Sequence, residues 1–346
     1  MSEYEELLDK FDKSDMAGWT RRFFDDLESA FQRDFDVIEE NDWHGVLCVG
    51  MGGSGAGGTY LSTISSKAAG LPVHYWRDYG LPSWWGPEWL VIATSYSGNT
   101  EETISSVEMA LREGGSVVGI SSGGRLEDLL KESENSVHIG VPGGQMPRSA
   151  FGHLFGTQLS LFWCMGLLPA PSNQELEEMI ARLRSSAEEW DPLVGTKAVD
   201  AARHISKSEI GIVAPSIMGC VASRFSCQLN ENSNLFARCS EVPEMNHNEI
   251  IPWTEDSGKS QALVLIRSDY EEARTSARID WFQNEANFSD RLVLKGEGVS
   301  LVEQMLYLSH ITDWITIVLA VSIGVDPSEM TLSLIHISEP TRLWHI

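Results

Sequence analysis

The sequence predicts an α/β protein made of two domains in tandem, each with a parallel β-sheet covered by helices. The chain is 346 residues long, which is typical of about two domains. Hydrophobic residues make up 42% of it, enough for a core in each domain. Short apolar runs alternate with helix-like segments in both halves, and this alternation is typical of parallel sheets that are buried on both faces.

The N-terminal segment, residues 1–40, is predicted to form a helical cover on the first domain. Leucines and phenylalanines recur in it between strongly acidic stretches, as they do in amphipathic helices. The first domain, residues 41–170, contains apolar runs that we interpret as strands, at residues 46–49, 73–76, 89–94, 117–120 and 137–141. Helices are expected between them, at residues 59–69, 101–112 and 126–133.

A polar, charged helix over residues 172–190 is the predicted connector, within a linking segment that we assign to residues 171–200. The second domain, residues 201–330, repeats the alternation. Its expected strands lie at residues 209–214, 261–267 and 291–295, and its expected helices at residues 220–230, 271–282 and 302–325. The apolar stretch 311–325 contains Asp313 and is shorter than the roughly 20 residues of a membrane span, so we expect a buried helix.

The composition limits the classes of partner and compartment. Asp and Glu number 50 against 25 for Lys and Arg, which gives a formal net charge of -25 and opposes binding to nucleic acids and to anionic membrane surfaces. A phosphorylated ligand meets the same repulsion, so local donors must bind it. The 5 cysteines are scattered without a CxxC pair, and the acidic N-terminus does not resemble a signal peptide, so we expect a cytoplasmic protein.

A run of small polar residues joins the predicted strand at 89–94 to the predicted helix at 101–112. Such a turn directs free backbone N–H groups and the positive end of a helix at one point, which favours an anion such as phosphate. The hydroxyl groups of Ser95, Ser97 and Thr100 add donors. Hydrogen bonds to a charged group contribute roughly 1.5–3 kcal/mol each, so several of them could hold a phosphate without a lysine.

A glycine-rich stretch follows the first predicted strand. The G-x-G-x-x-G pattern of dinucleotide sites occurs at Gly50, Gly52 and Gly55. Arg77 and Asp78 lie about twenty residues further on, where a contact to a ribose or a 2′-phosphate is expected. The stretch could also be a close-packed turn without a ligand. Ser54 favours a phosphate site, because it places a hydroxyl group at the tip of the turn, beside the loop at residues 95–100.

Three polar residues are candidates for chemistry, although each could also be an ordinary surface residue. Arg148 follows a pair of glycines and could stabilise negative charge on a substrate oxygen. Glu231 lies between two asparagines, and partial burial would raise its pKa towards the range of a general base. His247 lies in a polar loop with further residues of metal-ligand type, Glu241, Glu244 and Glu249. No second histidine stands at a ligand spacing, so no metal site is expected.

Five motifs, in this order along the chain, resemble those of the archaeal-type bifunctional phosphoglucose/phosphomannose isomerases of the sugar isomerase (SIS) superfamily. They are Met51-Gly52-Gly53-Ser54-Gly55, Ser95-Tyr96-Ser97-Gly98-Asn99-Thr100-Glu101-Glu102-Thr103, Pro147-Arg148-Ser149-Ala150, Gln228-Leu229-Asn230-Glu231-Asn232 and Glu244-Met245-Asn246-His247-Asn248-Glu249. The resemblance covers about residues 40 to 330. It implies two flavodoxin-like SIS domains. The serine-rich loop alone indicates only the superfamily, whereas the ordered set is far more specific.

The resemblance implies an isomerase without a cofactor that interconverts glucose 6-phosphate, and mannose 6-phosphate, with fructose 6-phosphate through a cis-enediol. It implies that the phosphate is held by Ser54, Ser95, Ser97 and Thr100, with Gly52, Gly53 and Asn99 near the site. Glu231 would move the proton between C1 and C2, and Arg148 would stabilise the enediolate. His247 would help to open the sugar ring from the neighbouring subunit, which implies a homodimer.

The end of the sequence departs from this family pattern. The family continues with a short helix carrying a lysine that assists ring opening, whereas the atypical tail, residues 331–346, contains no lysine and resembles translated adapter or vector sequence. Two alternatives stay open. One is a non-catalytic sugar-phosphate-binding protein of the same fold, and the other is a nucleotide-dependent oxidoreductase that uses the glycine pattern.

Overall fold

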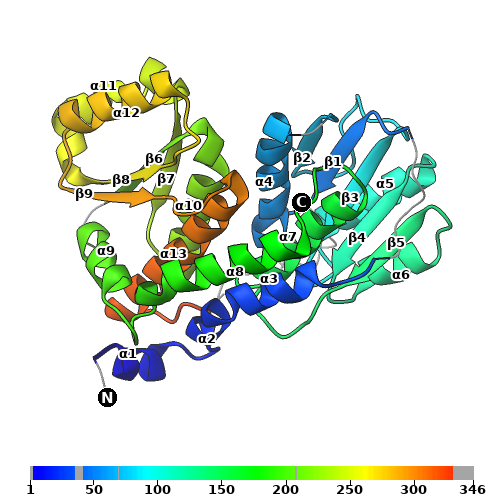
Figure 1. The fold of residues 1–346 in the computed structure, drawn as a ribbon, viewed down its shortest axis with the longest axis horizontal. Helices are drawn as coiled ribbons and strands as arrows, with labels where there is room; N and C mark the ends of the chain where they lie inside the picture. Colours follow the sequence, from blue (N-terminus) through cyan, green and yellow to red (C-terminus); the bar gives the residue numbers. More distant parts are fainter. Residues whose placement is uncertain (1–2, 36–41, 69, 207–208, 330–346) are drawn as a thin grey trace, which may run out of the picture.

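The computed structural model describes residues 3–35, 42–68, 70–206 and 209–329, and within them it has the predicted α/β architecture (Figure 1). Two parallel sheets, one in each half of the chain, are flanked by helices. The atypical tail predicted at residues 331–346 lies outside the described residues. We therefore describe the two halves and the helices that join them.

The first sheet has five parallel strands in the order β2-β1-β3-β4-β5. Their bounds are β1 Gly45–Val49, β2 Val73–Trp76, β3 Trp89–Thr94, β4 Val117–Ser121 and β5 Ser136–Gly140. Val46 of β1 is in register with Val73 of β2 on one side and with Leu90 of β3 on the other. The order reverses between β1 and β3, and ligands of open parallel sheets bind beyond the carboxyl ends of the strands at such a switch point. The fold thus favours a site formed by the residues that follow β1 and β3.

Alternate residues of β1 enter different cores, which explains its continuous apolar sequence. Val46 and Cys48 pack with α4 (Gly52–Ala68) and α7 (Phe151–Cys164), while Leu47 and Val49 pack with α5 (Glu101–Arg112) and α6 (Arg125–Lys131). The sheet is therefore covered on both faces, as the apolar runs predict. Helix α7 has no counterpart among the predicted elements, and α4 begins at Gly52 rather than after the glycines.

The second sheet has four parallel strands in the order β7-β6-β8-β9. Its elements are α9 Lys197–Ile205, β6 Glu209–Pro215, α10 Gly219–Ser233, β7 Ala237–Val242, α11 Ile250–Thr254, β8 Gln261–Arg267, α12 Ala273–Glu285, β9 Asp290–Lys295 and α13 Leu301–Ser322. Strand β7 has no counterpart in the prediction. It lies at the edge of the sheet and only Val242 is fully buried in it, so it lacks the apolar run that marks a central strand.

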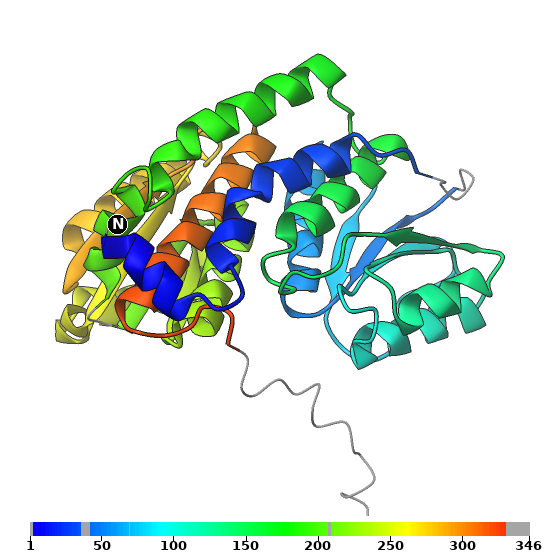
Figure 2. The ribbon, with the colours of Figure 1, turned by 90° about the horizontal axis from the view of Figure 1, so that it is seen from below.

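The N-terminal helices and the connector join the two halves (Figures 1 and 2). The helices α1 (Glu3–Phe11) and α2 (Met16–Arg21) pack on α13, whereas α3 (Phe23–Phe31) packs on α7. Only α3 therefore fits the expected cover on the first domain, and α1 and α2 lie on the second. The connector α8 (Asn173–Ala187) begins with a capping box between Ser172 and Glu175 and contacts both α3 and α13.

Helix α13 forms the centre of the second half, in agreement with the buried helix expected there. It is long and apolar enough to span a membrane, yet 94% of its most apolar window is buried inside the protein. Trp314 and Tyr307 are among the largest fully or nearly fully buried side chains. One continuous core connects this helix through α10 to α4 and α7 of the first half, so the two sheets are held in a defined relation.

Candidate active site

A cleft between the two halves contains the candidate residues Arg148 and Glu231, together with Gly52 and Gly53. It is lined by the start of α4, by the loop before α7 and by one face of α10. Among its lining residues are Gly52, Gly53, Arg77, Arg148, Arg224 and Glu231. Helices α4 and α10 approach each other here, so residues far apart in the sequence meet at the cleft.

The hydroxyl-rich loop after β3 has the geometry of an anion-binding turn. Ser95 Oγ and Thr100 Oγ1 are 2.8 Å apart and hydrogen-bonded, and Ser97 Oγ accepts from the backbone N–H of Asn99 at 3.2 Å. Thr100 is the N-cap of α5 but makes no side-chain capping bond, so the first N–H groups of α5 remain available. Gly98, with φ of 68°, permits the tight turn. Ser95, Ser97, Asn99 and Thr100 are therefore brought together as predicted.

Ser54 lies in the first turn of α4 and connects that helix to the loop. Its Oγ accepts a hydrogen bond of 3.0 Å from the backbone N–H of Tyr96, and its side chain is buried. A hydroxyl that accepts from a backbone N–H keeps its own proton for another acceptor. The same holds for Ser97. The expected juxtaposition of Ser54 with the loop at 95–100 is thus present in the structure.

The glycines at the start of α4 are explained by close packing. A Cβ atom on Gly55 would lie 2.2 Å from the carbonyl oxygen of Gly50, and one on Gly53 would lie 3.0 Å from Cα of Arg148. Gly53 therefore allows the Arg148 loop to approach the helix start. Arg77, which the dinucleotide interpretation assigns to a ribose or 2′-phosphate, lines the same cleft and stacks on Tyr75 at 5.2 Å.

Arg148 is fixed in the cleft, and one of its guanidinium nitrogens forms no hydrogen bond within the described chain. It is 3% exposed; its Nε donates to Asn232 Oδ1 at 2.6 Å, and its Nη2 donates to the carbonyl oxygen of Pro327 at 2.7 Å. The buried Nη1 forms no hydrogen bond within the described chain, but lies 3.5 Å from Glu231 Oε2. Burial lowers the pKa of Arg148, and the nearby Glu231 carboxylate opposes this effect. A buried donor without a hydrogen bond is rare, and in this position Nη1 can donate to an oxygen of a ligand in the cleft.

Glu231 faces Arg148 from the last turns of α10. Burial raises the pKa of its carboxyl group, and the positive charges of Arg148 and Arg224 act in the opposite direction. Its side chain is nevertheless 43% exposed, so a ligand in the cleft can reach the carboxylate. This combination of a raised pKa with access suits a group that takes up and returns a proton.

His247 is a candidate that the structure places away from the cleft, and the residues of the loop at 95–100 do not line it either. It ends the short helix η3 (Glu244–His247), beyond the edge strand β7, and its side chain is exposed. It is not among the residues that line the cleft with Glu231. Among the described residues, no group of three or more His, Cys, Asp and Glu side chains could hold a metal ion, including those around His247.

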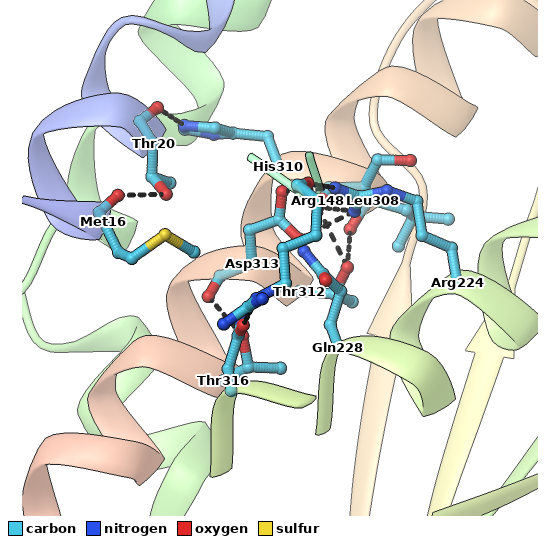
Figure 3. A network of polar contacts seen from close by, with 12 residues as sticks. Met16, Thr20, Arg148, Arg224, Gln228, Leu308, His310, Thr312, Asp313 and Thr316 are labelled. Carbon is cyan, nitrogen blue, oxygen red and sulfur yellow. Dashed lines mark hydrogen bonds and ion pairs between the residues drawn. The ribbon is translucent and has the colours of Figure 1, made fainter. Parts of the chain in front are cut away.

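Three further residues of the site were not predicted from the sequence. Asn232 supports Arg148, and Arg224 lines the cleft and bonds to Asp313 of α13 (Figure 3). One signal was present in the sequence. Asp313 is the single acidic residue of the apolar stretch 311–325, and such a residue requires a buried partner.

The sequence is similar to those of known proteins. A protein-family model described as the C-terminal SIS domain of bacterial phospho-glucose isomerase matches residues 195–332. The bifunctional phosphoglucose/phosphomannose isomerase of Aquifex aeolicus (strain VF5) is 31% identical over 289 residues, which cover 82% of this chain and 87% of that protein. The protein of the same name from Thermoplasma acidophilum is 32% identical over 288 residues, which cover 83% and 86% of the two chains.

Solved structures resemble the whole fold. The C-terminal domain of glucosamine-fructose-6-phosphate aminotransferase from Francisella tularensis superposes with a TM-score of 0.70 at 16% identity, covering 92% of this chain and 98% of that one. At this level of identity the likeness concerns the fold alone. Together with the match to the SIS-domain model, it confirms the predicted arrangement of two parallel sheets flanked by helices.

Proposed function

The chain belongs to the bifunctional phosphoglucose/phosphomannose isomerase family, and we propose that it interconverts glucose 6-phosphate and mannose 6-phosphate with fructose 6-phosphate. The observation that carries the proposal is the buried Nη1 of Arg148, which forms no hydrogen bond within the described chain and lies 3.5 Å from the Glu231 carboxylate. A base and an anion-stabilising donor that line one cleft are what an enediol reaction requires.

The substrate phosphate binds at the loop of residues 95–100 and at the start of α4. The hydroxyl groups of Ser54, Ser95, Ser97 and Thr100 and the N–H groups of the first turn of α5 serve as donors. Gly52, Gly53 and Asn99 shape this part of the site. Support comes from the position of the loop at the switch point of the sheet and from the uncapped N-terminus of α5.

Glu231 moves the proton between C2 and C1 of the open-chain sugar. Its carboxylate takes the proton from C2 of the aldose, the electron pair forms the C1–C2 double bond, and the carbonyl electrons move to O1, which is then protonated. The proton that leaves O2 as the C2 carbonyl forms balances the proton taken up at O1, and Glu231 returns to C1 the proton that it took from C2. The Nη1 donor of Arg148 stabilises the negative charge on the enediolate oxygen. Removal of the C2 proton gives the same enediol from both epimers.

His247 acts in ring opening from the partner subunit of a homodimer. This assignment is supported by its exposed position on η3, away from the cleft of its own chain. A cytoplasmic location is supported by the free state of Cys48, Cys164, Cys220, Cys227 and Cys239.

The direct test measures fructose 6-phosphate formed from each aldose phosphate. Glu231→Gln is expected to lower kcat by about 10²–10⁴-fold, because it removes the general base, while thermal-shift binding of fructose 6-phosphate remains. The exposed Glu113→Gln is the control and should behave as wild type. An active wild type with a fully active Glu231→Gln would remove Glu231 from the reaction.

The same assay separates the alternatives. Binding of fructose 6-phosphate without turnover, also when residues 331–346 are replaced by a lysine-bearing helix of the family, would favour a sugar-phosphate sensor and overturn the isomerase proposal. A gain of activity only after this replacement would identify the tail as the defect. A rise in melting temperature with NAD or NADP would instead favour the oxidoreductase.

A further inference from the structure

Asp313 is a buried carboxylate that the proposed reaction leaves unused. It lies in α13, a helix of 22 mostly apolar residues, and its residue is 6% exposed. Its Oδ1 and Oδ2 accept from Nη1 and Nη2 of Arg224 at 2.7 and 2.8 Å, and Oδ1 also accepts from Gln228 Nε2 at 2.8 Å (Figure 3). A buried charge is tolerated only with such partners.

Arg224 connects this carboxylate to the cleft. Its guanidinium lies 4.3 Å from the ring of Phe151, and its Nη2 also donates to the backbone carbonyl oxygen of Arg148 at 3.4 Å. The group is therefore held along one edge by Asp313 and on one face by an aromatic ring. It lines the cleft in a single orientation.

The partners of Asp313 share a face of α10 with the proposed base. Arg224, Gln228 and Glu231 follow the i, i+4, i+7 spacing of one helix face. The other groups that line the cleft with Glu231 and are charged or titratable are Arg77, Arg148, Cys220 and Cys227, and Asp326 acts electrostatically on Arg148. Arg224 differs from Arg77 and Arg148 because both carboxylate oxygens of a buried residue, Asp313 of α13, bind it. Asp313 itself does not line the cleft.

We propose that Asp313 and Arg224 form a positioning pair for the isomerisation, in which Asp313 fixes Arg224, and Arg224 supports the Arg148 backbone and keeps a permanent positive charge beside Glu231. The proposal rests on the function proposed above. Arg224 opposes the effect of burial on the pKa of Glu231, because positive charge favours the ionised carboxylate. The ionised form is the one in which Glu231 can accept a proton.

The test compares two arginine–carboxylate pairs whose acidic residues both lie on α13. Arg224→Gln/Asp313→Asn replaces the positioning pair by two amides. The matched control is Arg182→Gln/Glu303→Gln, because Glu303 is also a buried acid of α13 bound by an arginine fork, at 2.9 and 3.1 Å, and lies away from the cleft. Both double variants keep hydrogen-bonding groups, and their melting temperatures report folding.

The expected result concerns rate and pH profile together. In Arg224→Gln/Asp313→Asn, kcat should fall at least roughly tenfold with a smaller change in KM, since substrate-binding groups are untouched. The acid limb of kcat/KM should move upward by about half a pH unit or more, because Arg224 is the member of the pair whose charge lowers the pKa of Glu231. The control pair should leave both unchanged. Arg224→Lys, which keeps the charge but loses the fork, should lower kcat and leave the acid limb in place.

Two results would overturn the proposal. One is a folded Arg224→Gln/Asp313→Asn variant with the wild-type kcat and acid limb, and the other is an equal effect of both pairs. If the double variant does not fold, Arg224→Lys decides, because an unchanged kcat in it would also refute the positioning role. A carboxyl ¹³C NMR titration of Glu231 in wild type and variants measures the effect of the Arg224 charge on this carboxyl group and does not require turnover. Absence of turnover in wild type would then refute the proposed function, while the titration still tests the pair.

Discussion

The buried histidine of α13 predicts a specific dependence of stability on pH. His310 is 4% exposed, with the rings of Phe23 and Phe24 at 5.4 and 4.4 Å. Its Nε2 bonds to the carbonyl oxygen of Thr20 at 3.0 Å, while Nδ1 has no hydrogen-bond partner in the described part of the chain (Figure 3). A proton on Nδ1 would be a buried donor without an acceptor. Burial accordingly lowers the pKa of His310 from 6.5 to about 4.

The sign and size of the effect follow from this shift. The unfolded chain binds the proton near pH 6.5 and the folded chain only near pH 4, so the unfolded state binds more protons between these values. The free energy of unfolding is therefore at its full value above pH 6.5 and falls as the pH drops towards 4. At about 1.4 kcal/mol per pKa unit, the loss amounts to about 3 kcal/mol, of which about 2 kcal/mol has occurred by pH 5.

Denaturant unfolding of wild type and His310→Gln across this pH range isolates the contribution. The variant keeps a donor for the Thr20 carbonyl but has no titrating ring. Between about pH 7 and pH 5, wild type should lose about 2 kcal/mol more than the variant, whatever their stabilities at neutral pH. His44→Gln changes an exposed histidine and should retain the wild-type slope. Equal slopes for wild type and His310→Gln would refute the reasoning.

Three other substitutions test the packing around the cleft and the connector. Gly53→Ala places a Cβ 3.0 Å from Arg148 Cα and should lower kcat roughly tenfold by displacing the Arg148 loop, so a wild-type rate would contradict the close-packing argument. Asn232→Leu leaves Arg148 Nε buried without its acceptor and should lower the free energy of unfolding by about 1.5–3 kcal/mol in denaturant titrations, together with kcat. Ser172→Ala breaks the capping box with Glu175 and should cost about 1 kcal/mol of stability, with isomerase activity retained.

Much of the fold could be predicted because its central strands carry their own signal. The bounds of the central strands β3 and β8 and of the helix α5 agree with the expected ranges, since each is a continuous apolar run or an amphipathic stretch with clear ends. The bounds of the edge strand β2 agree as well. The edge strand β7 gave no such signal, because only its last residue is fully buried. A strand of this kind is stabilised by its neighbour β6 rather than by its own composition.

The start of α4 shows why local propensity misplaced a helix boundary. Glycine is a poor helix former, so the sequence predicts a turn through residue 58 and a helix only after it. In the folded chain the glycines let the helix begin at Gly52, because Gly55 packs directly against the backbone of Gly50 and Gly57 against Gln158. Close contacts with distant segments stabilise this part of the helix although glycine has a low helix propensity. The glycines alone do not indicate that these contacts form.

The candidate site likewise contains contacts between residues close in sequence and contacts between residues far apart in sequence. The hydroxyl-rich loop at residues 95–100 could be predicted because strand, hydroxyl residues and helix follow one another in sequence, and the structure keeps them together. The contacts of Arg148 with Asn232 and of Arg224 with Asp313 join residues 84 and 89 positions apart, so no spacing rule specifies them.

The single acid of the apolar stretch 311–325, Asp313, nevertheless carried partial information. A buried carboxylate in an apolar helix requires a cation, and this requirement can be read from the sequence. With 25 lysines and arginines in the chain, the sequence does not say which one it is. That choice depends on the packing of α10 against α13, which also sets where Glu231 faces Arg148. The sequence therefore specifies which chemical groups the site needs, whereas the contact between these two helices determines how they are aligned.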